Sequence, residues 1–264
     1  MSTDPRQDWR EWREAREAAV SAPYGPLSLA GHHWLSDRPE GRIPAVPGEW
    51  RADGDEVVLT AAGGDGLAVD GKPFTGTVRL AADQGPAGES RVAAGERRFV
   101  LLRREGEWAV RDFDPGAGTR RAFRGVEVTP YDERWVVPGV FRPYGETRDV
   151  RVGNADGRER DLGLAGELVF ALDGDERTLQ VAVGEGGSLW AVFADATSGD
   201  DSHRFRFLKP PAPAPAADGT VTVDFNRALL PPCAFADHFL CPFPPPGNTL
   251  DVAVPAGERR LVRN

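Results

Sequence analysis

The stretch Glu167–Val183, ELVFALDGDERTLQVAV, decides the fold class because it holds two apolar runs joined by a tight turn. Asp173-Gly174 lies between the runs, and an Asp-Gly pair flanked by strand-forming residues is a strong signal for a β-hairpin. The sequence therefore predicts strands at Gly166–Leu172 and Arg177–Val183. The first run shows little alternation of apolar and polar residues, which is typical of a central strand covered on both faces or of a strand inside a closed barrel.

Short apolar runs of the same kind continue on both sides of this hairpin. Gly, Pro and Asp separate them, and the 31 Gly and 23 Pro make a turn-rich composition. No helical pattern alternates with the strands, which disfavours α/β architectures of the Rossmann and TIM types. The further predicted strands are Glu56–Thr60, Gly66–Val69, Gly76–Ala81, Arg97–Arg103, Glu107–Phe113, Arg134–Val137, Val140–Arg142, Thr147–Val152, Leu189–Ala194, Phe205–Leu208, Val221–Phe225 and Thr249–Val254.

The N-terminal segment has the spacing of apolar residues that predicts a helix. Trp9 and Trp12 lie three residues apart, and Asp4 is suited to cap a helix whose first residue is Pro5. The loop Asp114–Gly118, DPGAG, ends the first block of strands and indicates a boundary. We expect an all-β protein with an N-terminal helix and linker in residues 1–30, a small antiparallel β-sandwich in residues 31–118, and a larger antiparallel β-barrel or sandwich in residues 119–264.

Composition and charge exclude several classes of protein. The chain has 264 residues, 40% hydrophobic and 28% charged, so it can bury a large core and is neither disordered nor collagen-like. Its formal net charge of −9 argues against nucleic acid or an anionic membrane surface as a partner. The N-terminus is polar, with no stretch typical of a signal peptide, and no window is apolar enough to span a membrane. We expect a soluble protein in the cytoplasm.

Polar and charged residues gather at two places in the second block of strands. One group follows the end of an apolar strand, where β-scaffolds commonly place binding loops, and the other surrounds Phe225. Two interpretations stay open: turns and ion pairs that serve the structure, or a site for a small polar or anionic molecule at the mouth of the C-terminal β-domain. The candidate ligand-binding residues are Asp195, Thr197, Arg206, Asp224, Asn226 and Arg227.

Three candidate metal ligands, Cys233, His238 and Cys241, lie in a proline-rich segment that follows the last of these residues. Thiolate and imidazole groups bind zinc and iron, although the spacing matches no standard zinc-finger pattern. Three interpretations stay open. The residues form a metal site, Cys233 and Cys241 form a disulfide or redox pair, or both cysteines are buried reduced thiols.

Motifs spread over most of the chain after the first helix resemble the DUF1684 family, a bacterial and archaeal family of unknown function. The segments that carry the resemblance are Phe123–Gly125, Pro130–Gly139, Phe141–Tyr144, Phe193–Gly199, Arg206–Leu208, Val223–Arg227, Pro231–Phe235, Cys241–Pro245, Asn248–Leu250 and Ala256–Glu258. The resemblance implies that the candidate binding residues, both cysteines and Asn248 belong to a framework that the family shares. It does not separate structural residues from those of a site.

Two segments depart from the family pattern. Leu229-Leu230 stands where the family usually has a tyrosine and an asparagine before Pro-Pro, and Ser202–Phe205 stands where a glycine-rich stretch usually precedes Arg-Phe-Leu. Both changes add bulk or remove polarity near the candidate site, so an activity of the family could be altered in this chain.

Three classes of function are compatible with the sequence. The protein binds or transforms a small polar or anionic molecule, it is a metal or redox protein that uses the two cysteines and His238, or it is a non-catalytic module that binds another protein. The sequence indicates neither a particular cofactor nor an oligomeric state, and it leaves open whether the protein is an enzyme.

Overall fold

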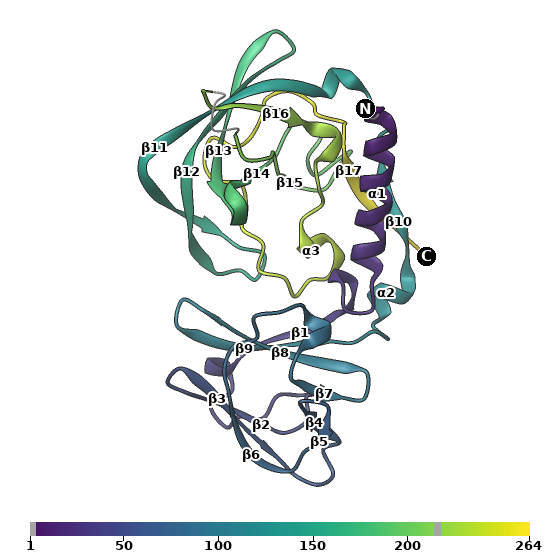
Figure 1. The fold of residues 1–264 in the computed structure, drawn as a ribbon, viewed down its shortest axis with the longest axis vertical. Helices are drawn as coiled ribbons and strands as arrows, with labels where there is room; N and C mark the ends of the chain where they lie inside the picture. Colours follow the sequence, from purple (N-terminus) through teal and green to yellow (C-terminus); the bar gives the residue numbers. More distant parts are fainter. Residues whose placement is uncertain (1–3, 214–217) are drawn as a thin grey trace. The chain divides into compact units, whose positions relative to one another are not determined.

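The computed structural model describes residues 4–213 and 218–264 and consists mainly of antiparallel β-sheet (Figure 1). Two compact units make up the chain. The barrel unit comprises Met1–Glu17 and Arg124–Asn264, and the sandwich unit comprises Ala18–Phe123. The predicted all-β fold, with a smaller N-terminal sandwich and one N-terminal helix, is confirmed. The division of the chain at residues 30 and 118 stays a prediction.

The sandwich unit contains two antiparallel sheets. The order of strands is β1-β9-β8-β7-β4-β5 in one sheet and β2-β3-β6 in the other. The turns at Asp70-Gly71 and Glu105-Gly106 have positive φ at both residues, as tight hairpins require. The strands are β1 (Leu29–Trp34), β2 (Glu49–Asp53), β3 (Glu56–Ala61), β4 (Leu67–Val69), β5 (Lys72–Pro73), β6 (Gly76–Leu80), β7 (Val92–Ala94), β8 (Arg97–Arg104) and β9 (Glu107–Phe113).

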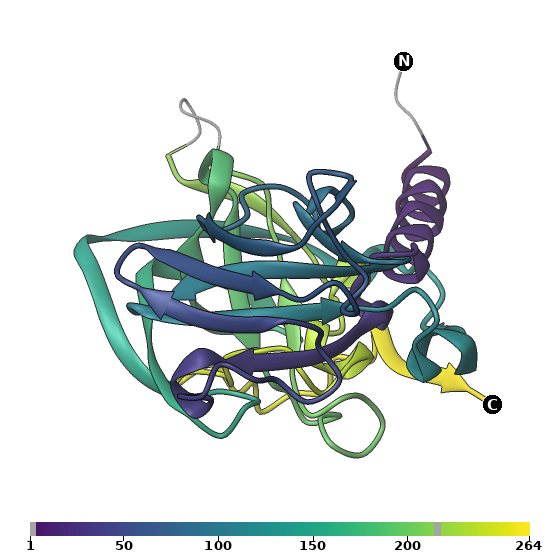
Figure 2. The same ribbon diagram turned by 90° about the horizontal axis from the view of Figure 1, so that it is seen from below.

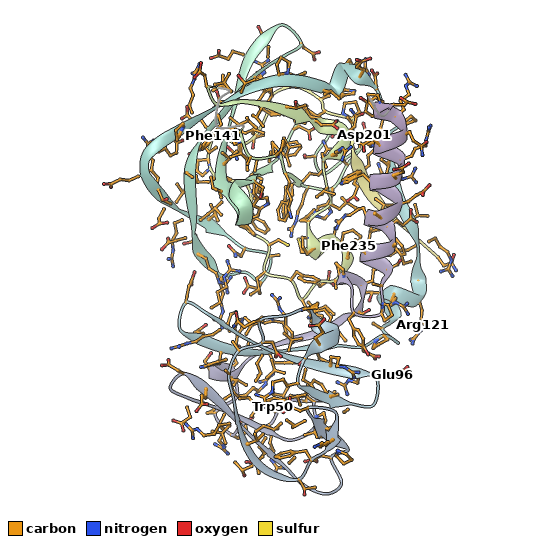
Figure 3. The ribbon with its side chains drawn as sticks, viewed as in Figure 1. Trp50, Glu96, Arg121, Phe141, Asp201 and Phe235 are labelled. Carbon is orange, nitrogen blue, oxygen red and sulfur yellow. The ribbon has the colours of Figure 1, made fainter. Side chains whose placement is uncertain are left out.

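One apolar core joins the two sheets of the sandwich unit. Trp50 of β2 is fully buried, and Figure 3 shows it among the strands. Its ring centroid lies 6.0 Å from that of Phe99 on β8, so the two rings connect the two sheets. Val57 and Leu59 of β3 and Leu101 of β8 belong to the same core. Burial of these side chains on both sheets is what stabilises a two-layer sandwich.

The barrel unit is built on a six-stranded antiparallel sheet that curves into a half-barrel (Figure 1). Its order is β15-β14-β13-β12-β11-β16, and a separate two-stranded sheet joins β10 and β17. The strands are β10 (Phe123–Val128), β11 (Val136–Gly153), β12 (Glu159–Leu172), β13 (Asp175–Val183), β14 (Leu189–Phe193), β15 (Arg206–Leu208), β16 (Thr220–Asp224) and β17 (Glu258–Arg263).

The hairpin predicted from Glu167–Val183 is formed by β12 and β13. Leu172 pairs with Asp175 across a turn in which Asp173 and Gly174 have positive φ. β12 lies between β11 and β13, and its consecutive residues Leu168, Val169 and Phe170 are all buried. Coverage of both faces explains why this run does not alternate.

Phe225, directly after β16, is at the centre of the core of the barrel unit. It is fully buried, and its ring centroid lies 5.4 Å from that of Phe170, 6.0 Å from that of Phe193 and 6.5 Å from that of Trp135. These rings come from β12, β14 and the turn before β11, so a single side chain connects distant parts of the curved sheet.

The predicted strand Thr249–Val254 is wrong. Its pairing with the sheet is limited to an isolated parallel bridge between Ala194 and Thr249. The backbone of Val254 bonds to side chains instead, because its N–H donates to Asp195 Oδ1 at 3.2 Å and its carbonyl accepts from Arg206 Nη2 at 2.5 Å. At Val254, bonds to an ion pair therefore take the place of bonds to a neighbouring strand, while Leu250 N donates to Ala194 O at 2.9 Å and Val252 O accepts from Ala196 N at 3.1 Å.

Other strand boundaries also differ from those predicted. The predicted strands Arg134–Val137, Val140–Arg142 and Thr147–Val152 merge into β11, whose pairing with β12 shifts register between Pro143 and Arg148. That irregularity interrupts the apolar pattern and makes one bent strand look like several. The strands that the apolar pattern does not predict are β1, β2, β5, β7, β10 and β17.

The predicted N-terminal helix is α1 (Pro5–Ser21), which is unbroken in Figures 1 and 2. Asp4 Oδ1 accepts from Arg6 N at 3.1 Å, the expected N-cap contact. Within the barrel unit, Trp9 Nε1 donates to Asn226 O at 3.0 Å. The other helices are α2 (Gly118–Ala122) and α3 (Pro232–Phe235). None of the helices in residues 4–213 and 218–264 has both the length and the apolar character of a membrane span.

We predict that Phe225→Ala lowers the free energy of unfolding of the barrel unit by about 4 kcal/mol, because it leaves a cavity among three aromatic rings. Val140→Ala is the control: Val140 lies on β11 with 37% of its surface exposed, and the expected loss is below about 0.5 kcal/mol. Urea unfolding followed by tryptophan fluorescence measures both. Equal losses for the two variants would contradict the placement of Phe225 at the centre of this core.

Candidate functional site

The six candidate binding residues form two groups within the barrel unit. Asp195, Thr197 and Arg206 are buried together around the end of β14 and the start of β15. The other three residues surround the single turn that follows β16, where Asn226 is buried while Asp224 and Arg227 are half-buried. The first group is an internal network, and the second reaches the surface.

The first group is a fully buried ion pair. Arg206 Nη2 lies 2.7 Å from Asp195 Oδ2, and both side chains are 0% exposed. Asp195 Oδ1 accepts from the backbone N–H of Thr197 at 2.8 Å and from its hydroxyl at 2.7 Å. Burial alone would raise the pKa of Asp195, but the charge of Arg206 and the hydrogen bonds from Thr197 outweigh it, so the pKa lies below its usual value.

Arg206 also holds the segment that leads to β17. Its Nη1 donates to Ala256 O at 2.5 Å, and its Nη2 donates to Val254 O at 2.5 Å. Because neither charged side chain reaches solvent, a dissolved ligand cannot contact this pair in this conformation. Asp195, Thr197 and Arg206 therefore serve as framework in this structure.

The second group joins α1 to the turn after β16. Arg227 Nε lies 3.2 Å from Asp224 Oδ2, and Arg227 Nη2 lies 2.6 Å from Asp8 Oδ2. The guanidinium also lies over the ring of Trp12, 5.3 Å from its centroid. The amide of Asn226 donates to Asp224 Oδ1 at 2.9 Å and shapes the turn. Two carboxylates and an aromatic face thus fix Arg227 at the surface.

A cavity of about 520 Å³ lies beside Arg227, within the barrel unit. This volume falls in the usual range for small-molecule sites. α1 contributes Asp8 and Trp12 to its wall, and the turn after β16 contributes Asp224 and Arg227. The remaining lining residues are Leu208, Lys209, Pro210, Pro211, Thr222 and Leu229. The cavity therefore combines charged groups with an apolar and aromatic surface.

The sequence predicts two of these lining residues, Asp224 and Arg227, and misses Lys209 and Trp12. Lys209 directly follows β15 and is exposed. Among the described residues, its ammonium group has neither an ion pair nor a hydrogen bond. A lone lysine before a proline run carries no motif, and Trp12 is placed here only by the docking of α1. Folding, rather than local sequence, brings both residues to the cavity.

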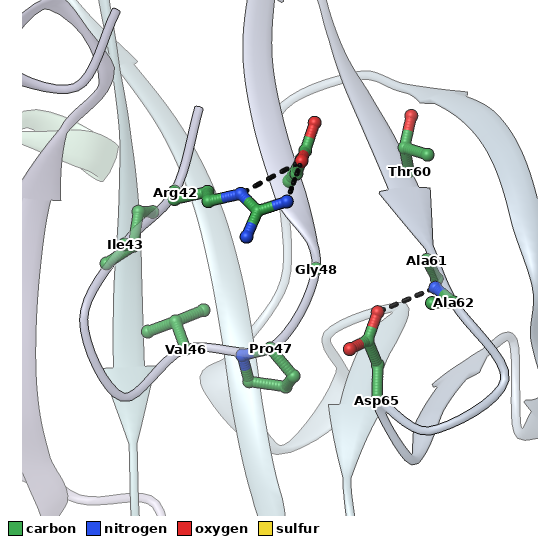
Figure 4. A pocket seen from close by; sticks show the side chains of 10 residues that line it. Arg42, Ile43, Val46, Pro47, Gly48, Thr60, Ala61, Ala62 and Asp65 are labelled. Carbon is green, nitrogen blue, oxygen red and sulfur yellow. Dashed lines mark hydrogen bonds and ion pairs between the residues drawn. The ribbon is translucent and has the colours of Figure 1, made fainter. Parts of the chain in front are cut away.

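The sandwich unit has its own cavity of about 430 Å³, shown in Figure 4. The charged side chains at its wall already form hydrogen bonds with neighbouring residues. The Arg42 guanidinium donates to Glu49 Oε1 at 2.8 and 3.0 Å, and Asp65 Oδ2 accepts from Ala62 N at 2.6 Å. Arg42 is also 77% exposed. The cavity beside Lys209 is the stronger candidate, because a cation there is available to a ligand.

Of the three candidate metal ligands, Cys233 and Cys241 lie together, with the backbone N–H of Cys233 donating to Cys241 Sγ at 3.2 Å. Cys233 is half-buried, Cys241 is buried and His238 is exposed. The imidazole that lies close enough to lower the pKa of Cys233 is that of His203. Within the part of the chain that the structure describes, no three His, Cys, Asp or Glu side chains are grouped in a way that could hold a metal ion. The arrangement favours thiol chemistry over metal binding.

The fold and the cavity define an antiparallel β-scaffold with a pocket of ligand size. Residues 121–259 match the family model described as "Protein of unknown function (DUF1684)", and the chain belongs to this family. The chain is similar to the uncharacterized protein from gene locus rrnAC0354 of Haloarcula marismortui, solved by solution NMR, with 33% identity and a TM-score of 0.44. The alignment covers 52% of this chain and 77% of that one. None of the curated proteins compared matches this chain.

We predict that Asp195→Asn and Arg206→Met each lower the free energy of unfolding by about 3–5 kcal/mol, because each leaves a buried partner uncompensated. The double variant is expected to lose less than the sum, since it removes both charges. Urea unfolding of all four proteins gives the coupling energy.

The control pair for this cycle is Arg151 and Asp161, 3.4 Å apart on the surface of the same unit and 60% and 56% exposed. Each single substitution there is expected to lower the free energy of unfolding by less than about 1 kcal/mol, and the double substitution by the sum of the two. Additive losses at Asp195 and Arg206 would refute the role assigned to the buried pair.

Proposed function

We propose that the protein binds a small molecule with one anionic group and an apolar body in the cavity beside Lys209 and Trp12. The single observation that carries this proposal is the presence of an available ammonium group at the wall of a cavity of about 520 Å³ that is otherwise largely apolar. An anion at that position would gain a charge-assisted hydrogen bond.

The carboxylates of the cavity are less available to a ligand than the Lys209 ammonium. Those of Asp8 and Asp224 are both engaged by Arg227, at 2.6 and 3.2 Å. This one guanidinium offsets half of their negative charge, whereas Lys209 has no acidic partner among the described residues, so the lysine is the group that favours an anion. The hydroxyl of Thr222, also at the wall, can donate a hydrogen bond to the same anionic group.

The apolar part of the ligand would lie against Trp12, Leu208 and Leu229. Arg227 covers the Trp12 ring at 5.3 Å and so restricts its rotation. Pro210 and Pro211 add a rigid wall, because proline fixes its own backbone. A surface that is ordered before binding loses little entropy when a ligand arrives.

We predict that 2-naphthoate binds more tightly than its neutral analogue 2-naphthamide, and that 2-naphthamidine, the cationic analogue, binds most weakly. Isothermal titration calorimetry with the three compounds separates charge from shape. Tighter binding of the amidine would contradict the proposal, because it would assign the recognition to Asp8 and Asp224.

Lys209→Gln is expected to weaken 2-naphthoate binding about fivefold, the effect of one exposed charge pair, and to leave 2-naphthamide unchanged. Lys72→Gln is the matched control, since Lys72 is the other lysine of the chain and is exposed on β5 of the sandwich unit. An equal effect of both substitutions would show general attraction of anions rather than a site.

A further inference from the structure

A second cluster of reactive side chains lies at the other end of β15, outside the cavity. The backbone N–H of Cys233 donates to Cys241 Sγ at 3.2 Å, and the side chains of Cys241 and His203 are close enough to lower the pKa of Cys233. Neither of these two described cysteines is in a disulfide bond. This contact brings Cys241 Sγ against the residue that carries the other thiol, which is the proximity that a disulfide between the two cysteines requires.

The surroundings of this cluster are electropositive. The hydrogen bond with Cys241 is the largest influence on the pKa of Cys233 and lowers it, whereas burial raises it. The hydrogen bond and charge of His203 and the charge of Arg204 lower this pKa further, so it falls from 9.0 to about 5. A thiolate, rather than a thiol, is the nucleophilic form of cysteine.

The two cysteines differ in access. Cys233 is half-buried, whereas Cys241 is only 5% exposed. Cys241 packs with Phe205 and Phe207 in an apolar cluster, and Phe243 packs against the same cluster. An oxidant from solvent therefore meets Cys233 first.

Hydrogen bonds fix the backbone around Cys241 and His203. The carbonyl of Cys241 accepts from Ala155 N at 2.9 Å, and the amide of Asn154 donates to Leu240 O at 3.2 Å. His203 N donates to Arg259 O at 2.8 Å, which fixes the residue that carries the imidazole. The cluster is thus assembled before any reaction.

We propose that Cys233 and Cys241 are a redox-responsive pair, in which Cys233 attacks a hydroperoxide and Cys241 then closes an intrachain disulfide. His203 is a positioning residue that stabilises the attacking thiolate. This site is independent of the proposed ligand cavity, so the failure of one proposal leaves the other standing.

The proposed reaction passes two electrons from the two thiols to the peroxide. The Cys233 thiolate attacks one oxygen of hydrogen peroxide, an S–O bond forms, the O–O bond breaks, and the released hydroxide takes a proton to become water. Cys241 then attacks the sulfur of the resulting sulfenic acid, an S–S bond forms, the S–O bond breaks, and the second oxygen leaves as water with the thiol proton. Overall, the two thiols lose two electrons and two protons, and the peroxide gains them.

The stabilised thiolate also makes the disulfide reversible. A low thiol pKa favours the reduced form and therefore raises the reduction potential of the pair. We expect a dithiol reductant such as dithiothreitol to regenerate both thiols.

The direct test uses the full reduced chain, treated with hydrogen peroxide and then with iodoacetamide, and measured by intact mass spectrometry. The expected product is about 2 Da lighter than the untreated chain and carries no alkyl group, since the chain has two cysteines in total. Peptide mapping should join Cys233 to Cys241. Two alkylated cysteines after treatment, or oxidation of each sulfur without a crosslink, would overturn the proposal.

Two single variants separate the roles of the sulfurs. In Cys241→Ser, the sulfenic acid has no resolving thiol, and dimedone is expected to label Cys233. In Cys233→Ser, the buried Cys241 is expected to remain unlabelled under the same conditions. Faster labelling of Cys241 than of Cys233 would reverse the assignment and contradict the proposal.

A pH profile tests the role of His203. Alkylation of wild-type Cys233 by iodoacetamide is expected to reach half its maximal rate near pH 5 and to fall at lower pH, where the thiolate is protonated. His203→Gln should move this midpoint to higher pH. His238→Gln, a change at an exposed histidine, is the matched control and should leave it in place. A wild-type midpoint near the usual value of about 8.5, or no shift in His203→Gln, would contradict the assignment.

Discussion

Arg206 carries a guanidinium into the core of the barrel unit, and the surrounding chain is arranged to compensate that charge. Asp195 neutralises it at 2.7 Å, and the carbonyls of Val254 and Ala256 accept hydrogen bonds from its two terminal nitrogens. A buried arginine without these partners would be costly, so β14, β15 and the segment before β17 must fold together. Glu258, which follows Ala256 closely, extends the same arrangement: one oxygen accepts from Leu230 N at 2.7 Å and the other lies 3.1 Å from Arg16 of α1.

The buried ion pair of Arg206 positions both the cavity beside Lys209 and the cysteine cluster of the barrel unit. β15 begins at Arg206, and the residues on either side of this short strand belong to different sites. Lys209 follows the strand and lines the cavity, while His203 precedes it and contacts Cys233. Phe207 and Leu229 exchange backbone hydrogen bonds of 2.8 Å in both directions, so the wall of the cavity is fixed by the same strand. The anchored ion pair therefore explains how a strand of three residues can hold two sites in defined positions.

Local sequence was sufficient to predict the strands where apolar runs and Asp-Gly turns dominate, as in the hairpin of β12 and β13. It also predicted the N-cap and the first residue of α1. It failed at Thr249–Val254, where backbone bonds to Ala194 and Ala196 do not extend into a strand and the backbone of Val254 bonds to Asp195 and Arg206 instead. For the candidate site residues too, local sequence identifies neighbouring charges but not contacts between distant segments. Asp224 and Arg227 are recognisable as neighbouring charges, but Trp12 and Lys209 meet only through tertiary structure. His203, far from the cysteines along the chain, takes the place that proximity in sequence had assigned to His238.

The most direct test of the central claim, that the cavity of the barrel unit binds an anion with an apolar body, is a crystal structure of the protein with 2-naphthoate. The account predicts the carboxylate at hydrogen-bond distance from Lys209 Nζ and the rings against Trp12. Naphthoate bound elsewhere, with this cavity empty in the same crystal, would contradict it.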